Sequence, residues 1–196
     1  MNSTIEYYQN KAQEYAAETL NIDMYEAYRK FVQYVSAEGK ILDIGCGSGR
    51  DSLYFIKQGF KVVATEPTPA LRDIASAYTG LNVLNTTFQA LNFNDEFDGI
   101  WCCASLLHVP TVELPSVINN LVQSLKQNGV LYISVKKGNG EQNIGGRHFT
   151  FFTEHNLVET MLRNPKISLV DTWQNSDYRL GESNTCWLNF IFLKDN

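Results

Sequence analysis

The residues best placed to do chemistry are the glycines of ILDIGCGSGR, at 41–50, and the carboxylate of Glu66. In this segment a short apolar run ends in Asp43 and then breaks into alternating glycines. That pattern is typical of a buried parallel strand that turns sharply into a helix, with its backbone close to a bound molecule. Glu66 follows Gly47 by 19 residues, at the end of the next apolar run, and a carboxylate there can hold a ribose diol. The pattern predicts a small-ligand site at the carboxyl edge of a parallel sheet.

Two classes of nucleotide ligand fit this glycine segment. A dinucleotide-binding fingerprint reads G-x-G-x-x-G, with pyrophosphate on the helix N-terminus. Here Arg50 occupies the third glycine position, which departs from the fingerprint without excluding it. Both ligand classes contain a ribose, so Glu66 indicates a ribose without deciding between them. The alternative is a solvated carboxylate at the end of a strand.

Alternating strands and helices must position these residues. The sequence predicts five strands, at 40–44, 61–65, 82–86, 98–103 and 130–135. Start signals and apolar stripes predict helices at 51–58, at 69–78, from Leu114 to a stop at Asn128-Gly129, and from a cap at Thr153 to a stop before Asn164-Pro165. Two further apolar runs, 167–173 and 187–193, leave no room for a helix between them. They predict an antiparallel hairpin.

This order of elements predicts an α/β fold. We expect a Rossmann-like, doubly wound, mostly parallel seven-stranded sheet with an antiparallel terminal hairpin and two N-terminal helices within 6–36, one at 6–18 and one that begins at a cap at Asp23. We expect one domain over 1–196, composed of an N-terminal helical cap at 1–38 and a Rossmann-like core at 39–196. In such sheets ligands bind beyond the carboxyl ends of the strands, near the point where the strand order reverses.

The composition argues against several classes of function. The 196 residues are 44% apolar and carry a formal net charge of −5. An acidic chain without a basic cluster is a poor binder of nucleic acid, because phosphate neutralisation supplies most of that affinity. No apolar run approaches the ~20 residues of a membrane span and no export core is present, so we expect a cytoplasmic protein with no membrane partner. The four cysteines lack the spacing of a zinc site, and no metal is predicted.

Four blocks in this order resemble the class I S-adenosylmethionine-dependent methyltransferases. They are ILDIGCGSGR at 41–50, VVATEPTPAL at 62–71, FDGIWCCASLLHVP at 97–110 and LKQNGVLYISVKKG at 125–138. The later blocks look most like small-molecule methyltransferases, including those of the tellurite-resistance type. The resemblance implies an enzyme that transfers the methyl group of S-adenosylmethionine to a small-molecule acceptor by in-line displacement, with S-adenosylhomocysteine as the product.

The resemblance places the methionine end of the cofactor on the glycine segment. Gly45, Cys46 and Gly47 would line the cofactor through their backbones. Asp43 would orient the loop or reach the methionyl ammonium through water. Arg50 would meet the methionyl carboxylate, or lie exposed at the start of the helix.

The resemblance places the adenosine end on the neighbouring strands. Glu66 would bind the ribose and Pro67 would pack on the adenine. Gln89 and Ala90 occupy the position where the family often has an acid and a small residue near the adenine amine, so an amide oxygen replaces the acid here. Cys103 would touch the cofactor from the end of the fourth predicted strand.

His108 is the candidate catalytic base. In-line positioning supplies much of the acceleration of methyl transfer, but a hydroxyl, amine or thiol acceptor can also need a base. His108 lies in the loop beyond the fourth predicted strand and titrates near neutral pH; alternatively it caps the next helix or packs under the loop. His148 and Arg147 lie in a segment predicted to be flexible and to cover the cleft. Arg147 would bind an anionic acceptor or face solvent.

Aromatic residues surround the predicted cleft. Tyr8 and Tyr15 recur near helical spacing, and would form a lid over the cofactor or pack in the core. Four residues near the terminal hairpin would shape the acceptor pocket or simply be buried: Trp173, Tyr178, Arg179 and Trp187.

Two other functions stay open on the sequence alone. One is an NAD-dependent oxidoreductase and the other a non-catalytic S-adenosylmethionine-binding module. We expect a small-molecule methyl acceptor and no nucleic-acid partner. The oligomeric state is open, between a monomer and a weak dimer.

Overall fold

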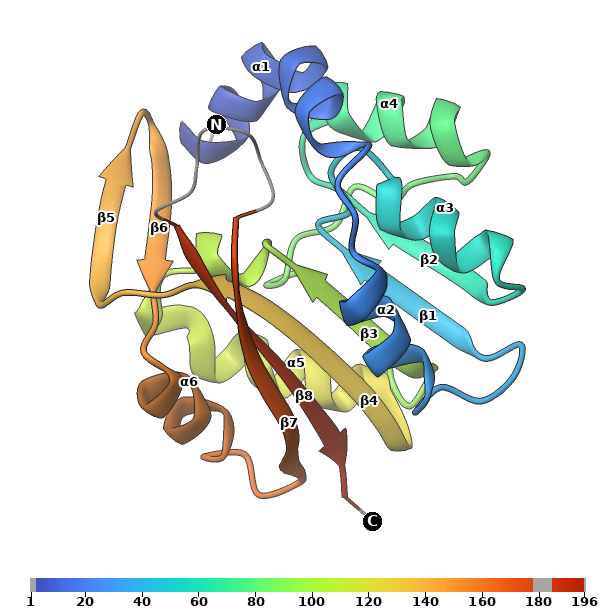
Figure 1. Cartoon of the computed structure of the whole chain (residues 1–196), viewed down its shortest axis with the longest axis vertical. Coiled ribbons are helices and arrows are strands. Elements are labelled where there is room, and N and C mark those ends of the chain that lie inside the picture. Colours follow the sequence, from blue (N-terminus) through green and yellow to red (C-terminus); the bar gives the residue numbers. More distant parts are fainter. Residues whose placement is uncertain (1–2, 178–184, 196) are drawn as a thin grey trace.

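A six-stranded sheet lies at the centre of the chain (Figure 1). The computed structural model describes residues 3–177 and 185–195. Within them the strands have the order β2-β1-β3-β4-β8-β7. Their bounds are β1 (Lys40–Ile44), β2 (Lys61–Thr65), β3 (Phe97–Cys103), β4 (Leu125–Lys136), β7 (Ile167–Ser176) and β8 (Cys186–Lys194). β1 to β4 pair in parallel, and β8 is antiparallel to both β4 and β7. The predicted α/β fold and its antiparallel terminal hairpin are confirmed.

The predicted count of seven strands is wrong, because residues 82–86 shrink to a single bridge. Only Leu84 pairs with β2. Its amide donates to the Ala64 carbonyl at 2.9 Å, and its carbonyl accepts from the Glu66 amide at 2.9 Å. The Thr86 amide then donates back to the same Leu84 carbonyl at 3.1 Å, so the chain turns away before a second pair forms.

Helices cover both faces of the sheet. They are α1 (Ser3–Thr19), α2 (Tyr25–Val32), α3 (Arg50–Lys57), α4 (Pro69–Thr79), α5 (Leu114–Ser124) and α6 (Glu154–Met161), with short 3-10 turns η1 (Leu106–His108) and η2 (Thr111–Glu113). On one face, Phe31 of α2 and Phe55 of α3 pack against Trp101 of β3. On the other face, Leu121 of α5 and Leu157 of α6 belong to a second buried cluster. Successive strand residues alternate between the two cores, as the pleat requires.

Helix α5 ends earlier than its sequence predicts. The expected stop was Asn128-Gly129, but the helix ends at Ser124 and the chain continues directly as β4. The amides of Asp95 and Glu96 donate to the carbonyls of Gln123 and Ser124, at 2.9 and 3.0 Å. These carbonyls would otherwise accept from the next helical turn, so a contact distant in sequence ends the helix.

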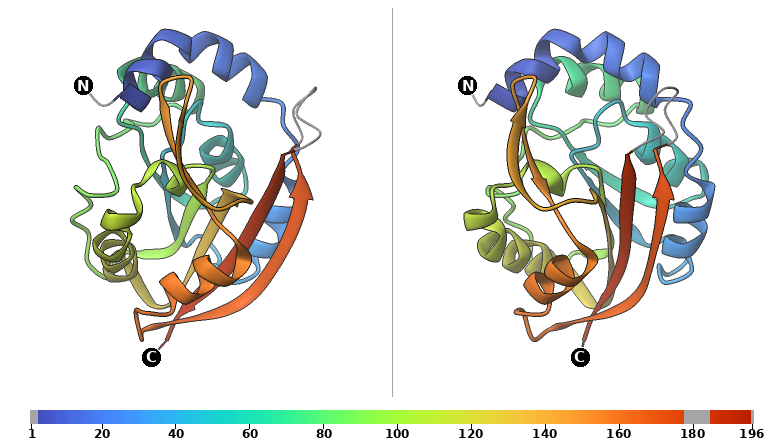
Figure 2. Two further views of the ribbon diagram at one scale, coloured as in Figure 1. Left: turned by 90° about the vertical axis from the view of Figure 1, so that its left-hand side faces the viewer. Right: turned by 60° about the vertical axis from the view of Figure 1, so that its left-hand side comes forward.

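The segment after β4 forms a hairpin, where the sequence predicted a flexible stretch. Gly145 and Gly146 make its turn, both at positive φ, which is what a tight two-residue hairpin turn favours. The amide of His148 donates to the Thr4 hydroxyl at 2.9 Å and so ties the hairpin to α1. The two elements lie side by side in both views of Figure 2. The hairpin strands are β5 (Gly140–Ile144) and β6 (Arg147–Phe151).

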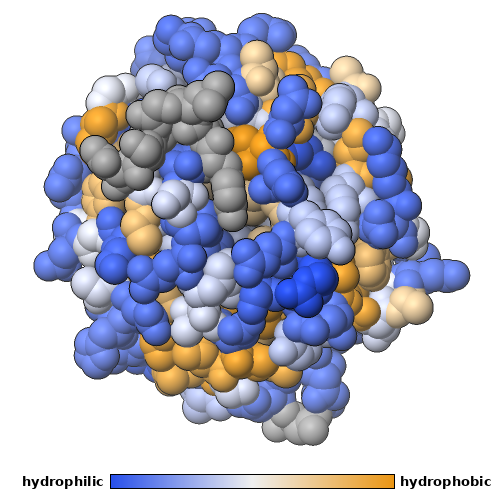
Figure 3. Space-filling model, viewed as in Figure 1, coloured by the Kyte–Doolittle hydropathy of each residue, from blue (hydrophilic) through white to orange (hydrophobic). Residues whose placement is uncertain are grey.

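The predicted N-terminal helices are present and lie in different places. α1 crosses the carboxyl ends of the parallel strands, whereas α2 packs on the sheet beside β1 (Figure 1). The face seen in Figure 3 is mostly hydrophilic, with apolar residues in separate patches. No helix in the described part of the chain is both long enough and apolar enough to span a bilayer.

Candidate active site

The glycine segment makes the predicted sharp turn at the carboxyl end of β1. Gly45 and Gly47 have φ of 69° and 56°, in the left-handed region that favours glycine. The amides of Gly45 and Cys46 both donate to the Thr65 carbonyl, at 2.9 and 3.0 Å. A Cβ on Gly45 would lie 2.7 Å from the Cβ of Ser105, in the loop after β3. The turn therefore lies at the point where the strand order reverses, between β1 and β3.

Two cavities open above this turn and share a wall. The first, here the Glu66 cavity, is lined among others by Gly47, Glu66, Pro67, Phe88, Gln89 and Ser105. The second, here the Arg147 cavity, is lined among others by Cys46, Arg50, Cys103, Lys136, Arg147 and Trp187. Both are lined by Tyr8, Tyr15, Gly45, Ala104 and His108. A ligand that spans this wall would occupy both cavities.

Glu66 faces the glycine turn, as the spacing predicts. Its two carboxylate oxygens accept from backbone amides, Oε2 from Gly47 at 3.1 Å and Oε1 from Thr68 at 2.8 Å. Only 5% of the residue is exposed, and burial raises the pKa of the carboxyl above its usual value. Each oxygen keeps acceptor capacity beyond its single amide bond. A carboxylate held this rigidly can bind the two hydroxyls of a ribose.

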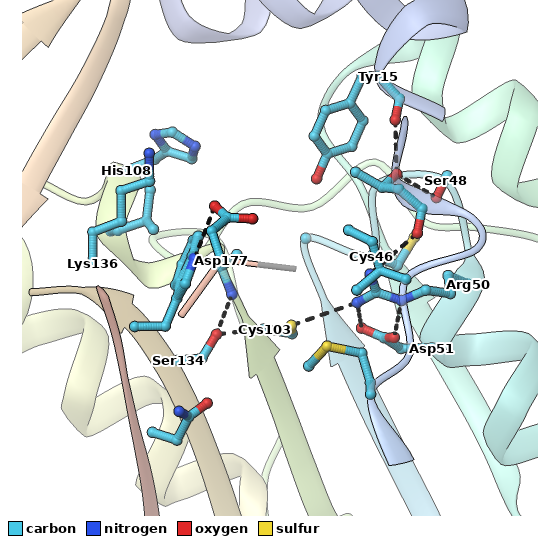
Figure 4. Close-up of a pocket in the computed structure, with 18 of the residues that line it drawn as sticks. Tyr15, Cys46, Ser48, Arg50, Asp51, Cys103, His108, Ser134, Lys136 and Asp177 are labelled. Atoms are coloured by element: carbon cyan, nitrogen blue, oxygen red, sulfur yellow. Dashed lines mark hydrogen bonds and ion pairs between the residues drawn. The ribbon is translucent and has the colours of Figure 1, made fainter. Parts of the chain in front are cut away.

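Arg50 forms a fork with its neighbour Asp51 at the start of α3 (Figure 4). Nε donates to Oδ1 at 2.6 Å and an Nη donates to Oδ2 at 2.9 Å. Asp51 also accepts from Tyr28 at 2.5 Å and from the indole N–H of Trp101 at 2.8 Å. Burial opposes the charge of Asp51, yet the guanidinium holds the pKa of its carboxyl below the usual value. The same Nη approaches the Cys103 sulfur at 3.7 Å, and the other Nη donates to the Thr19 carbonyl at 3.3 Å.

Asp43 and Cys103 lie at the base of the site. Asp43 is 1% exposed, lines neither cavity, and accepts a 2.6 Å hydrogen bond from Ser52. Burial raises the pKa of its carboxyl. Of its two predicted roles, this position favours orienting the loop. Cys103 lines the Arg147 cavity, where burial raises the pKa of its thiol to about 12 and keeps the sulfur neutral.

His108 lies in the shared wall, with both ring nitrogens engaged. Nδ1 lies 2.7 Å from the carbonyl oxygen of His148, and a carbonyl only accepts, so Nδ1 carries the proton. Nε2 then accepts from the Tyr8 hydroxyl at 3.1 Å. Burial, with a smaller contribution from Arg147, lowers the pKa of His108 to about 4. The imidazole is therefore neutral at physiological pH and joins α1, η1 and the hairpin.

Tyr15 packs against the glycine turn from above. A Cβ on Gly47 would lie 3.2 Å from Cε1 of Tyr15. The rings of Tyr8 and Tyr15 meet edge to face, with centroids 5.1 Å apart. Both tyrosines line both cavities. The aromatic stripe of α1 therefore covers the site and is not confined to a core.

The geometry has a counterpart among known proteins. The model of a family described as "Methyltransferase domain" matches residues 20–164. The chain belongs to this methyltransferase family. The prediction of a methyltransferase is confirmed at the level of this family.

Named relatives match parts of this methyltransferase. The ubiquinone biosynthesis O-methyltransferase of Rickettsia canadensis is 35% identical over 100 residues, which cover 48% of this chain and 42% of the relative. An uncharacterized methyltransferase of Staphylococcus carnosus is 31% identical over 137 residues, 66% of each chain. The chain thus spans less than half the length of the Rickettsia relative and about two thirds of the Staphylococcus one.

Solved structures share the fold of this methyltransferase. The 1,6-didemethyltoxoflavin-N1-methyltransferase of Burkholderia thailandensis, solved with 1,6-didemethyltoxoflavin and S-adenosylhomocysteine, aligns with a TM-score of 0.78 at 22% identity, over 98% of this chain and 85% of that one. A TehB-like S-adenosylmethionine-dependent methyltransferase of Corynebacterium glutamicum aligns with a TM-score of 0.70 at 22% identity, over 97% and 98% of the two chains.

The residues predicted to lie near the adenine occupy different positions around the Glu66 cavity. Pro67 lines the Glu66 cavity as expected. Gln89 lies at the edge of that cavity, exposed, with its side-chain N–H donating to Glu113 at 2.6 Å. Ala90 is exposed and lines neither cavity, because the chain has already turned outward after Gln89. The buried residue beside them, Phe88, lines the cavity instead.

Of the four residues near the terminal hairpin that were expected to shape the acceptor pocket, two lie within the described residues. Trp187 lines the Arg147 cavity, whereas Trp173 lines neither cavity and packs near Tyr132 in the core beneath it. Tyr178 and Arg179 lie outside the described residues.

Two residues of the methyltransferase site had no functional signal in the sequence. Asp51 begins a predicted helix, and acidic residues are common in the first turn of helices, so its residue type gives no functional signal. Ser105 stands in the loop after β3, and its buried hydroxyl has no hydrogen-bond partner among the described residues. The approach of Ser105 to Gly45 depends on the pairing of β1 with β3, which no local spacing encodes.

Proposed function

We propose that this methyltransferase transfers the methyl group of S-adenosylmethionine to a small-molecule acceptor, with adenosine in the Glu66 cavity and the acceptor in the Arg147 cavity. The observation that carries the proposal is the shared wall of the two cavities at Gly45, Ala104 and His108. A transferred group must lie between its donor and its acceptor. When bound, the cofactor would supply an electrophilic methyl group: the acceptor nucleophile attacks the methyl carbon in line, the sulfonium C–S bond breaks, and S-adenosylhomocysteine leaves with the electron pair, while the proton of the acceptor passes to solvent.

The Glu66 cavity fits an adenosine. Glu66 offers two rigid carboxylate oxygens for the ribose hydroxyls. Pro67 and Phe88 offer apolar surface for the adenine. Ser105 lines this cavity, and its buried hydroxyl has no partner among the described residues, although a buried hydroxyl usually has one. We assign the missing partner of Ser105 to the cofactor.

The glycine side of the Arg147 cavity fits the methionine end of the cofactor. Arg50 and Asp51 offer opposite charges for the methionyl carboxylate and ammonium groups. Cys46 supplies backbone, and the neutral thiol of Cys103 closes the base. A side chain on Gly47 would meet Tyr15, so glycine keeps the backbone and the ring in close contact here.

His108 acts in this proposal by positioning Tyr8. A base with a conjugate-acid pKa of about 4 takes up few protons at neutral pH, and its Nε2 already accepts from Tyr8. His108 therefore holds the hydroxyl of Tyr8 and the carbonyl of His148 in fixed places around the acceptor.

Methyl transfer from isotope-labelled cofactor to a metabolite extract, followed by mass spectrometry, tests the proposal. We expect a labelled product in the small-molecule fraction and an equal amount of S-adenosylhomocysteine. A Glu66→Gln variant is the matched control and should give much less of both. Cofactor binding without any labelled product would identify a non-catalytic binding module and contradict the proposal.

Other predictions about partners stay predictions. These are the absence of a nucleic-acid partner, a monomer or weak dimer, and a cytoplasmic location. The net charge of −5 supports the first of them.

A further inference from the structure

Arg147 at the start of β6 is held by aromatic rings, with no carboxylate paired to it among the described residues. Its Cζ lies 4.3 Å from the ring centroid of Tyr7, 5.0 Å from that of Phe149 and 6.0 Å from that of Tyr8. The Nε atom is buried and makes no hydrogen bond within the described residues. Arg147 itself lines the Arg147 cavity, and without a carboxylate partner among the described residues its guanidinium has capacity for a ligand.

The space in front of this guanidinium is aromatic and has few acids to compete for it. Phe149 has a second cation near it, since Lys136 Nζ lies 5.0 Å from its centroid and 5.7 Å from that of Trp187. Two acids line the same cavity. Asp51 is engaged by Arg50, and Asp177 accepts from the Trp187 indole at 3.0 Å. Figure 4 shows Lys136 and Asp177 around one space, on the side away from Arg50.

We propose that Arg147 binds the carboxylate of an aromatic acid, and that this acid is the methyl acceptor. The inference rests on the proposed function, because it names the substrate of the same site. A guanidinium fork matches the two oxygens of a carboxylate. Stacking on Tyr7 fixes the fork before the ligand arrives, which lowers the entropy lost on binding. Phe149 and Tyr8 line the cavity and offer aromatic surface for the flat ring of the acid, with its nucleophilic group toward Ala104 in the shared wall.

Binding to the cofactor-product complex separates this inference from the proposed function. Protein loaded with S-adenosylhomocysteine is titrated with 4-hydroxybenzoate, 4-aminobenzoate and 4-mercaptobenzoate, each beside its methyl ester. We expect at least one acid to bind roughly tenfold or more tightly than its ester, because the ester removes the charge that the guanidinium pairs with. Equal affinities within every pair, or no binding of any acid at millimolar concentration, would overturn the inference.

Three variants locate the effect. Arg147→Gln should remove the preference for the acid, and Arg147→Lys should keep part of it because the charge remains. Arg163→Gln changes an arginine whose side chain is 68% exposed, on the turn after α6, and should behave as the native protein. Methylation kinetics for any acid that reacts should show a raised KM in Arg147→Gln, with the KM for its ester unchanged.

The affinity for S-adenosylhomocysteine is measured first in every variant. If the native protein does not bind it, the proposed function fails. If it binds and Arg147→Gln weakens acid and ester equally, only the aromatic-acid inference fails. Should Arg147→Gln lose the cofactor product as well, the acid-to-ester ratio in the native protein and in Arg147→Lys still decides.

Discussion

Glu66 joins the backbone of the glycine turn to the proposed ribose. Replacing it by glutamine keeps the size but turns one acceptor oxygen into a donor that faces the Gly47 or Thr68 amide. We expect Glu66→Gln to weaken binding of S-adenosylhomocysteine by about 1–3 kcal/mol, the cost of lost charge-assisted hydrogen bonds. Isothermal titration measures it, with Glu159→Gln on α6 as an exposed control. An unchanged dissociation constant would remove Glu66 from the site.

His108 should make the stability of the protein depend on pH. Its folded-state pKa of about 4 lies below the ordinary value of 6.5, so below pH 6.5 the unfolded chain binds a proton that the native state refuses. The contribution is complete above pH 6.5 and is lost as the pH falls toward 4. Between pH 7.5 and 5 we expect a loss of roughly 2 kcal/mol of unfolding free energy from this group.

Urea unfolding at a series of pH values checks this expectation. His108→Gln cannot titrate and should lack that part of the pH dependence. His155→Gln, at a histidine whose side chain is 90% exposed, should retain it. If the unfolding free energies of the native protein and of His108→Gln changed with pH in the same way, the imidazole of His108 would titrate in the native state as it does in the unfolded chain.

Single residues were predictable from the sequence where their role depends on local spacing. Glu66 and the glycines follow two consecutive strands that pair in parallel, so the ends of these strands bring them together. The environment of His108 depends on Tyr8 and His148, which lie 100 and 40 residues away. No local pattern reports such partners, and this is why a residue expected as a base has both of its nitrogens occupied.

At the scale of elements, the turn after β1 depends on a close approach to the loop after β3. In Gly45→Ala the alanine would have to keep the backbone φ of 69°. Its Cβ would lie 2.7 Å from the Cβ of Ser105. The positive φ alone costs about 1–2 kcal/mol, and the clash adds to it. Gly80→Ala is the matched control, because Gly80 has φ of 76° and nothing within 4 Å of an added Cβ.

Denaturant unfolding of both variants separates the two costs. We expect Gly45→Ala to be less stable than Gly80→Ala, and to bind S-adenosylhomocysteine more weakly. Adding Ser105→Gly to Gly45→Ala should recover part of the stability, because it removes the Cβ that the alanine meets. Equal losses of unfolding free energy in Gly45→Ala and Gly80→Ala would mean that the loop after β3 moves aside without an energetic cost.

Elements were predictable where one residue pattern decides them, and not where a neighbour does. The cap at Thr153 accepts from the Asn156 amide at 3.1 Å, and Pro69 begins α4, as their sequences predict. The predictions of a strand at 82–86 and of the end of α5 were wrong, because hydrogen bonds from backbone groups distant in sequence determine where each element ends. The Gly145-Gly146 pair was a hairpin signal of its own.

At the scale of the whole molecule, alternating strands and helices were enough to predict the fold and the edge that carries the site. The order β2-β1-β3 places the two loops that meet over Gly45 side by side. How α1 and the β5–β6 hairpin close over this edge was not predictable, because both contact it through side chains far apart in sequence. Those two elements form the roof of the cavity in which we place the acceptor.

Ligand-induced stabilisation tests the site through the entire fold. A ligand that binds only the native state at 100 times its dissociation constant adds about 2.7 kcal/mol to the unfolding free energy. For a chain of this length that corresponds to a rise in Tm of roughly 5–10 °C. We expect this rise with S-adenosylhomocysteine and none with NAD, since Arg50 stands where a dinucleotide-binding turn has its third glycine. Glu66→Gln should reduce the rise, and a rise with NAD alone would favour the oxidoreductase instead.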